Sequence, residues 1–122
     1  MRQLRTHLVE DEYLDTVERM RHSGYRPAAV LDGGRVRCVA GFSIQENLYC
    51  DKHLYVDDLI TADSARSQGH GKRMLDWLTE EARRAGCVQL HQDSGIQRPN
   101  THRFYFREGL TISAYRFRKY LQ

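Results

Sequence analysis

The chain has 122 residues, of which 40% are hydrophobic and 29% charged, and its formal net charge is +3 at pH 7. This length suits a single core, so we expect residues 1–122 to form one domain. The first residues lack the apolar stretch of a secretory signal, and no run of 18 apolar residues is available to cross a membrane. The weak positive charge serves a small anionic ligand as well as nucleic acid.

The number and spacing of the cysteines and histidines indicate the cellular compartment and whether a metal site is expected. Cys38, Cys50 and Cys87 are an odd number at wide spacings, which makes a poor disulfide framework. Free thiols persist in the reducing cytoplasm, so we expect a cytoplasmic protein. The six histidines show no paired metal-binding spacing and the cysteines form no C-x-x-C motif, so we expect no metal site.

The first half of the chain predicts a helix and a hairpin. Apolar residues from Leu8 to Met20 recur at helical spacing, which predicts a helix over about residues 8–22 that ends at Gly24. Asp32-Gly33-Gly34 supplies the positive φ that a tight hairpin needs between two strands. Along the second strand, alternating residues should share one face: Val36, Cys38, Ala40, Phe42 and Ile44.

The second half alternates strands and helices. After a loop over residues 45–52, the β-branched and aromatic segment 53–61 predicts a third strand. An apolar stripe from Met74 to Ala85 predicts a helix that ends at Gly86. Three further elements are expected: a strand over residues 87–91, a helix from Pro99 to about Arg107, and a last strand over residues 111–121. This order predicts an α/β sandwich with a mixed central sheet flanked by helices.

The turn before the second of these helices carries two glycines and positive charge. A P-loop is excluded, because Arg66 stands at its first glycine and Arg73 follows the Gly71-Lys72 pair. A dinucleotide fingerprint is excluded as well, because Met74 occupies the place of its third glycine.

What remains is an arrangement suited to an anion. Gly69 and Gly71 let backbone N–H groups converge, and the positive end of the helix dipole faces the same point. Arg66, Lys72 and Arg73 add charge, so a phosphate or pyrophosphate is the preferred ligand. The alternative is a solvated loop with basic residues on an exposed helix.

These residues carry a family resemblance. Arg66-x-x-Gly69-x-Gly71, between a strand and an amphipathic helix, resembles the acetyl-CoA signature of the GNAT N-acetyltransferases, Q/R-x-x-G-x-G/A. Residues 102–110, HRFYFREGL, resemble the family's late helix, in which a tyrosine (here Tyr105) precedes a Gly-apolar pair by four residues. The resemblance covers roughly residues 8–120.

The resemblance implies where acetyl-CoA binds. Its pyrophosphate would lie on backbone N–H groups from about Gln68 to Lys72, and its pantetheine would run beside the third strand like an added strand. The implied cofactor-binding residues are Leu59, Ile60, Thr61, Arg66, Ser67, Gln68, Gly69, His70, Gly71, Lys72 and Arg73. We expect the His70 side chain itself to point to solvent.

The resemblance also implies an acetyl transfer to a primary amine by direct attack in a ternary complex. Tyr105 would protonate the departing thiolate, although it could instead be a packed aromatic residue. Asp57 or Asp58 would serve as base, directly or through a water; alternatively, both bind the amine's charge or cap a β-bulge. Asp93 could line the acceptor pocket, although Asp-Ser-Gly is also ordinary turn chemistry.

One departure from the family affects assembly. The family usually opens with a strand and a helix before the helix expected here, whereas only residues 1–7 precede it. The strand near residues 28–31 would then become a sheet edge, which a homodimer could cover by pairing edges or by exchanging residues 111–121. Two rival functions are a non-catalytic acyl-CoA-binding regulator, which the short N-terminus favours, and a nucleic-acid-binding module, which only the charge and residues 115–120 suggest.

Overall fold

The computed structural model describes residues 19, 21–61, 69–94 and 97–122, so most of the helix predicted over residues 8–22 lies outside the described residues. Four strands form one sheet in the order β1-β2-β3-β4: β1 (Arg26–Asp32), β2 (Arg35–Asn47), β3 (Asp51–Thr61) and β4 (Gln89–Gln92). The first three are antiparallel neighbours, and β4 runs parallel to β3. The mixed sheet predicted from the sequence is confirmed, with β1 at one edge of its described part.

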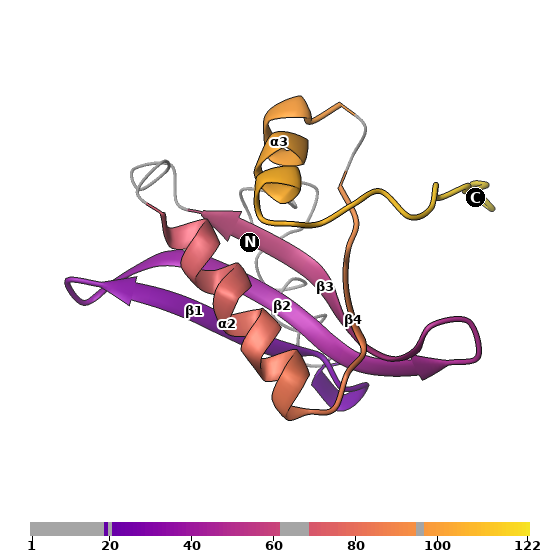
Figure 1. Cartoon of the computed structure of the whole chain (residues 1–122), viewed down its shortest axis with the longest axis horizontal. Helices are drawn as coiled ribbons and strands as arrows, with labels where there is room; N and C mark the ends of the chain where they lie inside the picture. The colour runs from indigo at the N-terminus through magenta and orange to yellow at the C-terminus, as the bar shows by residue number, and fades with distance from the viewer. Residues whose placement is uncertain (1–18, 20, 62–68, 95–96) are drawn as a thin grey trace.

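Helix α2 (His70–Arg84) lies across one face of the sheet, and α3 (Pro99–Arg107) lies beside the C-terminal part of β3 (Figure 1). The predicted apolar stripe of α2 faces the sheet and is buried through Met74, Leu78 and Ala82. It packs against the alternating side chains of the two central strands, namely Cys38, Ala40, Phe42, Leu54 and Val56. Val36 was expected on the same face, but it stands near the hairpin end of β2 and is exposed.

Three boundaries confirm local sequence signals. Gly33 and Gly34 both have positive φ, at 60° and 77°, and they join the paired residues Asp32 and Arg35 as a tight hairpin turn. Helix α3 begins at Pro99 and is followed by Gly109, whose φ is 91°. Within the described ranges, no helix is long and apolar enough to cross a membrane.

Two predicted segments differ from the structure. The loop expected over residues 45–52 is mostly hairpin, because β2 continues to Asn47 and β3 begins at Asp51. The Asn47 side chain makes this possible by accepting hydrogen bonds from the backbone N–H groups of Tyr49 and Cys50, at 3.0 and 2.8 Å. The prediction of a strand over residues 111–121 is wrong. Residues 110–122 have no regular secondary structure, and residues 111–122 are exposed.

The last segment fails to form a strand for a tertiary reason. Its composition favours a strand, but a strand is stabilised by pairing with a neighbour. In the described part of the sheet, no strand pairs with it, and Figure 1 shows the chain leading away from the sheet towards the C-terminus. Its large apolar side chains therefore stay exposed: Ile112, Tyr115, Phe117, Tyr120 and Leu121.

Candidate functional site

Strands β3 and β4 diverge and leave part of β3 with an open edge. The parallel pairing runs only from His53 opposite Gln89 to Val56 opposite Gln92, whereas β3 continues to Thr61. Residues 58–61 thus pair with β2 on one side, and on the other side no described strand is bonded to them. Backbone N–H and C=O groups along such an edge can pair with an extended amide chain.

A β-bulge lies where the strands diverge. Val56 and Leu59 both pack against the core under α2, although three residues of regular strand would place them on opposite faces. The pairing shows the reason: Phe42 lies opposite Val56 and Gly41 lies opposite Asp58, so Asp57 is the extra residue. The bulge turns Asp58 to the sheet face opposite α2.

Asp58 is a buried carboxylate held beneath an aromatic ring. It is 7% exposed, and its Oδ2 accepts a hydrogen bond of 3.4 Å from the Tyr25 hydroxyl. The ring of Tyr25 crosses the Cα of Gly41, and a Cβ on that glycine would overlap the phenol. Asp57 is only half-buried. The two neighbouring carboxylates therefore differ in their access to solvent.

The N-terminus of α2 presents backbone donors. Gly69 is the N-cap at φ 81°, no side chain among the described residues caps the helix, and the first turn contains no acidic residue. The helical bonding begins with Arg73 N–H donating to the Gly69 carbonyl at 3.0 Å, so the N–H groups of His70, Gly71 and Lys72 precede it. Arg66, Ser67 and Gln68, which belong to the same predicted site, lie outside the described residues.

Two side chains of this turn are placed differently from the expectation. His70 does not point to solvent: it is 4% exposed, and its Nε2 lies 3.9 Å from an Asp32 carboxylate oxygen, because the start of α2 packs onto the β1–β2 hairpin. Lys72 donates from Nζ to Glu108 at 3.0 Å and to Asp76 at 3.2 Å, and these hydrogen bonds raise the pKa of Lys72. Among the described residues of this turn, the backbone N–H groups and the exposed Arg73 are therefore the groups that could receive an anion.

Helix α3, which carries Tyr105, reaches the place where β3 ends and α2 begins through Phe104. A Cβ on Gly71 would lie 3.6 Å from both the Phe104 ring and the Thr61 hydroxyl, so the three elements meet there. Phe104 fills this contact, Phe106 is exposed, and Tyr105 between them is half-buried. Burial raises the pKa of Tyr105 to about 12, against a lowering effect of Arg98. The phenol is therefore protonated at neutral pH.

Beside the diverging strands, Asp93 belongs to a polar group that sequence reasoning did not assemble. Asp93, directly after β4, accepts hydrogen bonds from the Tyr55 hydroxyl and from Arg116, and Arg116 also donates to Tyr55 at 2.6 Å. The pKa of Tyr55 is raised to about 12, mainly by burial and secondly by the hydrogen bond and charge of Asp93. Nearby, Gln92 Oε1 and Ser94 Oγ are buried and have no hydrogen-bond partner in the described part of the chain. Asp93 was considered from the sequence, but its partners come from distant segments that no local pattern connects.

Comparisons with known proteins show the family of this chain. The family model described as the acetyltransferase (GNAT) family matches residues 2–109. The "Uncharacterized N-acetyltransferase YhdJ" of Bacillus subtilis (strain 168) is 36% identical over 121 residues, covering 98% of this chain and 85% of that protein. The "Aminoalkylphosphonate N-acetyltransferase" of Salmonella typhimurium is 39% identical over 66 residues, covering 54% of this chain and 43% of that protein.

Solved structures share the fold at lower identity. A transcriptional regulator from Bacillus halodurans C-125 superposes with a TM-score of 0.80 at 20% identity, covering 95% of this chain and 79% of that one. Glucosamine-6-phosphate N-acetyltransferase from Arabidopsis thaliana superposes with a TM-score of 0.72 at 18% identity, covering 93% and 80%. The arrangement of the open β3 edge, the α2 N-terminus and α3 thus belongs to a fold that these proteins share.

Proposed function

Because this chain belongs to the GNAT family of acetyltransferases, we propose that it transfers an acetyl group from acetyl-CoA to a primary amine by direct attack in a ternary complex. The observation that carries the proposal is the meeting of three elements at one place. The open edge of β3, the uncapped N-terminus of α2 and the protonated Tyr105 of α3 lie together there. They supply a track for an amide chain, donors for phosphate and a proton for a thiolate.

The cofactor would bind mainly through the backbone. The pyrophosphate would accept hydrogen bonds from the first N–H groups of α2, with Arg73 and the preceding residues 66–69 adding charge and donors. The pantetheine amides would pair with residues 59–61, as a strand added to the edge that β4 leaves open. Both contacts are independent of the Lys72 ammonium, which two carboxylates already engage.

The chemistry needs a base, an oxyanion donor and an acid. The amine nitrogen attacks the thioester carbonyl carbon, a C–N bond forms, and the C–S bond then breaks. Asp57 or Asp58 takes the proton from the amine, directly or through a water, on the face of the sheet opposite α2. A backbone N–H of β3 stabilises the oxyanion, and the Tyr105 hydroxyl protonates the CoA thiolate.

The acceptor is proposed as a small primary amine. The relative from Salmonella typhimurium is named for aminoalkylphosphonates, and the polar group of Tyr55, Asp93 and Arg116 beside the diverging strands offers both an anion and a cation. An amine that also carries an anionic group fits this pair of charges. A panel of aminoalkylphosphonates, polyamines and peptide amines, assayed by chromatography of the released CoA, tests the proposal.

The second candidate function is an acyl-CoA-binding regulator without turnover. The same panel separates the two candidates: a regulator is stabilised by CoA in thermal unfolding but releases no CoA from acetyl-CoA with any amine.

We also propose a cytoplasmic homodimer. The free cysteines Cys38, Cys50 and Cys87 suit a reducing compartment, and the β1 edge and the exposed residues 111–122 offer surfaces for a second copy.

A further inference from the structure

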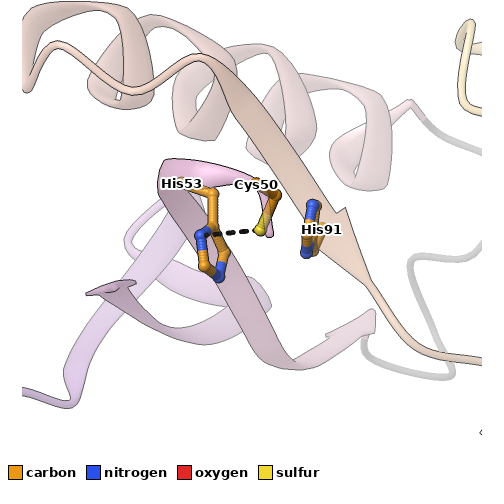
Figure 2. A group of neighbouring side chains, drawn as sticks. All are labelled: Cys50, His53 and His91. Atoms are coloured by element: carbon orange, nitrogen blue, oxygen red, sulfur yellow. Dashed lines mark hydrogen bonds between the residues drawn. The ribbon is translucent and has the colours of Figure 1, made fainter. Parts of the chain in front are cut away.

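A cysteine and two histidines meet on the sheet face opposite α2, beside the polar group of Tyr55 and Asp93. Cys50 lies in the β2–β3 turn, His53 near the start of β3 and His91 on β4, and Figure 2 shows the three side chains gathered together. Both histidines point away from α2, because their neighbours Leu54 and Leu90 pack into its core. Cys50 and His53 are buried, at 5% and 2% exposed, and His91 is half-buried.

The distances suit coordination of one metal ion. One ligand atom from each of the three side chains lies within 4.8 Å of the other two. Cys50 Sγ and His53 Nδ1 are 3.4 Å apart, joined by a hydrogen bond (Figure 2). Around a tetrahedral Zn²⁺, a thiolate sulfur and an imidazole nitrogen lie about 3.6 Å apart, given bond lengths of about 2.3 and 2.0 Å. This pair is already near that spacing, and the His91 ring stacks on His53 at 4.5 Å between centroids.

The surroundings hold the three groups in place. Asn47 Oδ1 accepts from the Cys50 backbone N–H at 2.8 Å and from its thiol at 3.2 Å, and Asp51 adopts a positive φ of 57° to turn the chain beneath them. Gln89 Oε1 lies 2.6 Å from His91 Nε2, the kind of outer contact that orients a metal-binding imidazole. The His53 Nδ1 lies 3.0 Å from the Asp51 carbonyl oxygen, and because a carbonyl only accepts, coordination through Nδ1 would replace this contact and release its proton.

We propose that Cys50, His53 and His91 form a binding site for Zn²⁺ that fastens the β2–β3 turn to β4. One thiolate and two imidazoles are a donor set that favours zinc, whereas magnesium and calcium require oxygen ligands. Binding displaces the Cys50 thiol proton, and a water completes four-coordination. The sequence did not indicate the site, because Cys50-x-x-His53 is a short spacing without a second pair and His91 comes from a strand 38 residues later.

The test uses the whole chain, stripped of metal with a chelator under reducing conditions and then incubated with Zn²⁺ or Co²⁺. We expect the wild type to retain one equivalent of Zn²⁺ after desalting and to unfold at a higher temperature with the metal. Co²⁺ should give the near-ultraviolet thiolate charge-transfer band and the visible bands of a tetrahedral site. Cys50→Ser should remove that band, and His91→Gln should weaken Zn²⁺ binding by more than about 100-fold, since loss of an outer contact alone costs 10–100-fold.

Matched controls are the half-buried Cys87→Ser and the exposed His22→Gln, both outside the cluster, which should bind as the wild type does. A wild type that retains no zinc, a cobalt spectrum without the thiolate band, or equal losses in the cluster and control variants would overturn the proposal. The wild-type spectrum requires no substitution, so a variant that fails to fold leaves the test intact. Because no readout involves acetyl transfer, failure here leaves the proposed acetyltransferase function untouched.

Discussion

Replacing Tyr105 with phenylalanine tests the proposed acid directly. The ring keeps its packing beside Phe104 on α3, so the substitution removes only the hydroxyl. Burial raises the pKa of that hydroxyl to about 12, which keeps the proton on it throughout the neutral range. A positioned general acid contributes about 10²–10⁴-fold, so kcat should fall by that factor. This loss corresponds to roughly 3–5 kcal/mol of transition-state stabilisation.

The assay is steady-state release of CoA with a saturating amine, and Tyr115→Phe is the matched control because Tyr115 lies in the exposed C-terminal segment. The KM for acetyl-CoA should change little in either variant. Since the pKa of Tyr105 is raised, its proton is lost only as the pH approaches about 12. Between pH 8 and 10, any fall in wild-type activity should therefore also appear in Tyr105→Phe. A Tyr105→Phe enzyme with full kcat would refute the reasoning and return Tyr105 to a packing role.

Three further substitutions address the cofactor site, the core and the assembly. Gly71→Val should abolish the stabilisation by CoA in thermal unfolding, whereas Gly71→Ala should keep it. A single Cβ makes only ordinary contacts with Thr61 and Phe104, and a valine exceeds that space. Equal stabilisation of both variants by CoA would contradict the proposed site. Gly41→Ala should lower the free energy of unfolding in urea by about 1–3 kcal/mol, since its Cβ overlaps Tyr25, and an unchanged midpoint would disprove that packing. Light scattering should find a wild-type dimer, and Val30→Pro on the β1 edge should weaken it. A monomeric wild type at tens of micromolar would argue against assembly. A dimer that Val30→Pro leaves unaffected would point to exchange of residues 111–121.

Structural features that depend on a few neighbouring residues were predicted correctly from the sequence. The Gly33-Gly34 hairpin, the stripe of α2 with its C-terminal Gly86, and the start of α3 at Pro99 all depend on the preferred φ of one residue or on helical spacing. The GNAT family was also predicted correctly, because the spacing of Gly69, Gly71 and Tyr105 is itself a local pattern.

Tertiary structure decided whatever depends on a distant partner. The Asp57 bulge follows from pairing with β2 and from packing under α2, and the burial of His70 follows from contact with the β1–β2 hairpin. Residues 111–121 have strand composition but no described strand to pair with, so they remain irregular. The cluster of Cys50, His53 and His91 exists only because β3 and β4 lie in parallel register. Local conformational preference acts over a few residues, whereas pairing and burial join residues tens of positions apart, and a linear pattern carries the first kind of information but not the second.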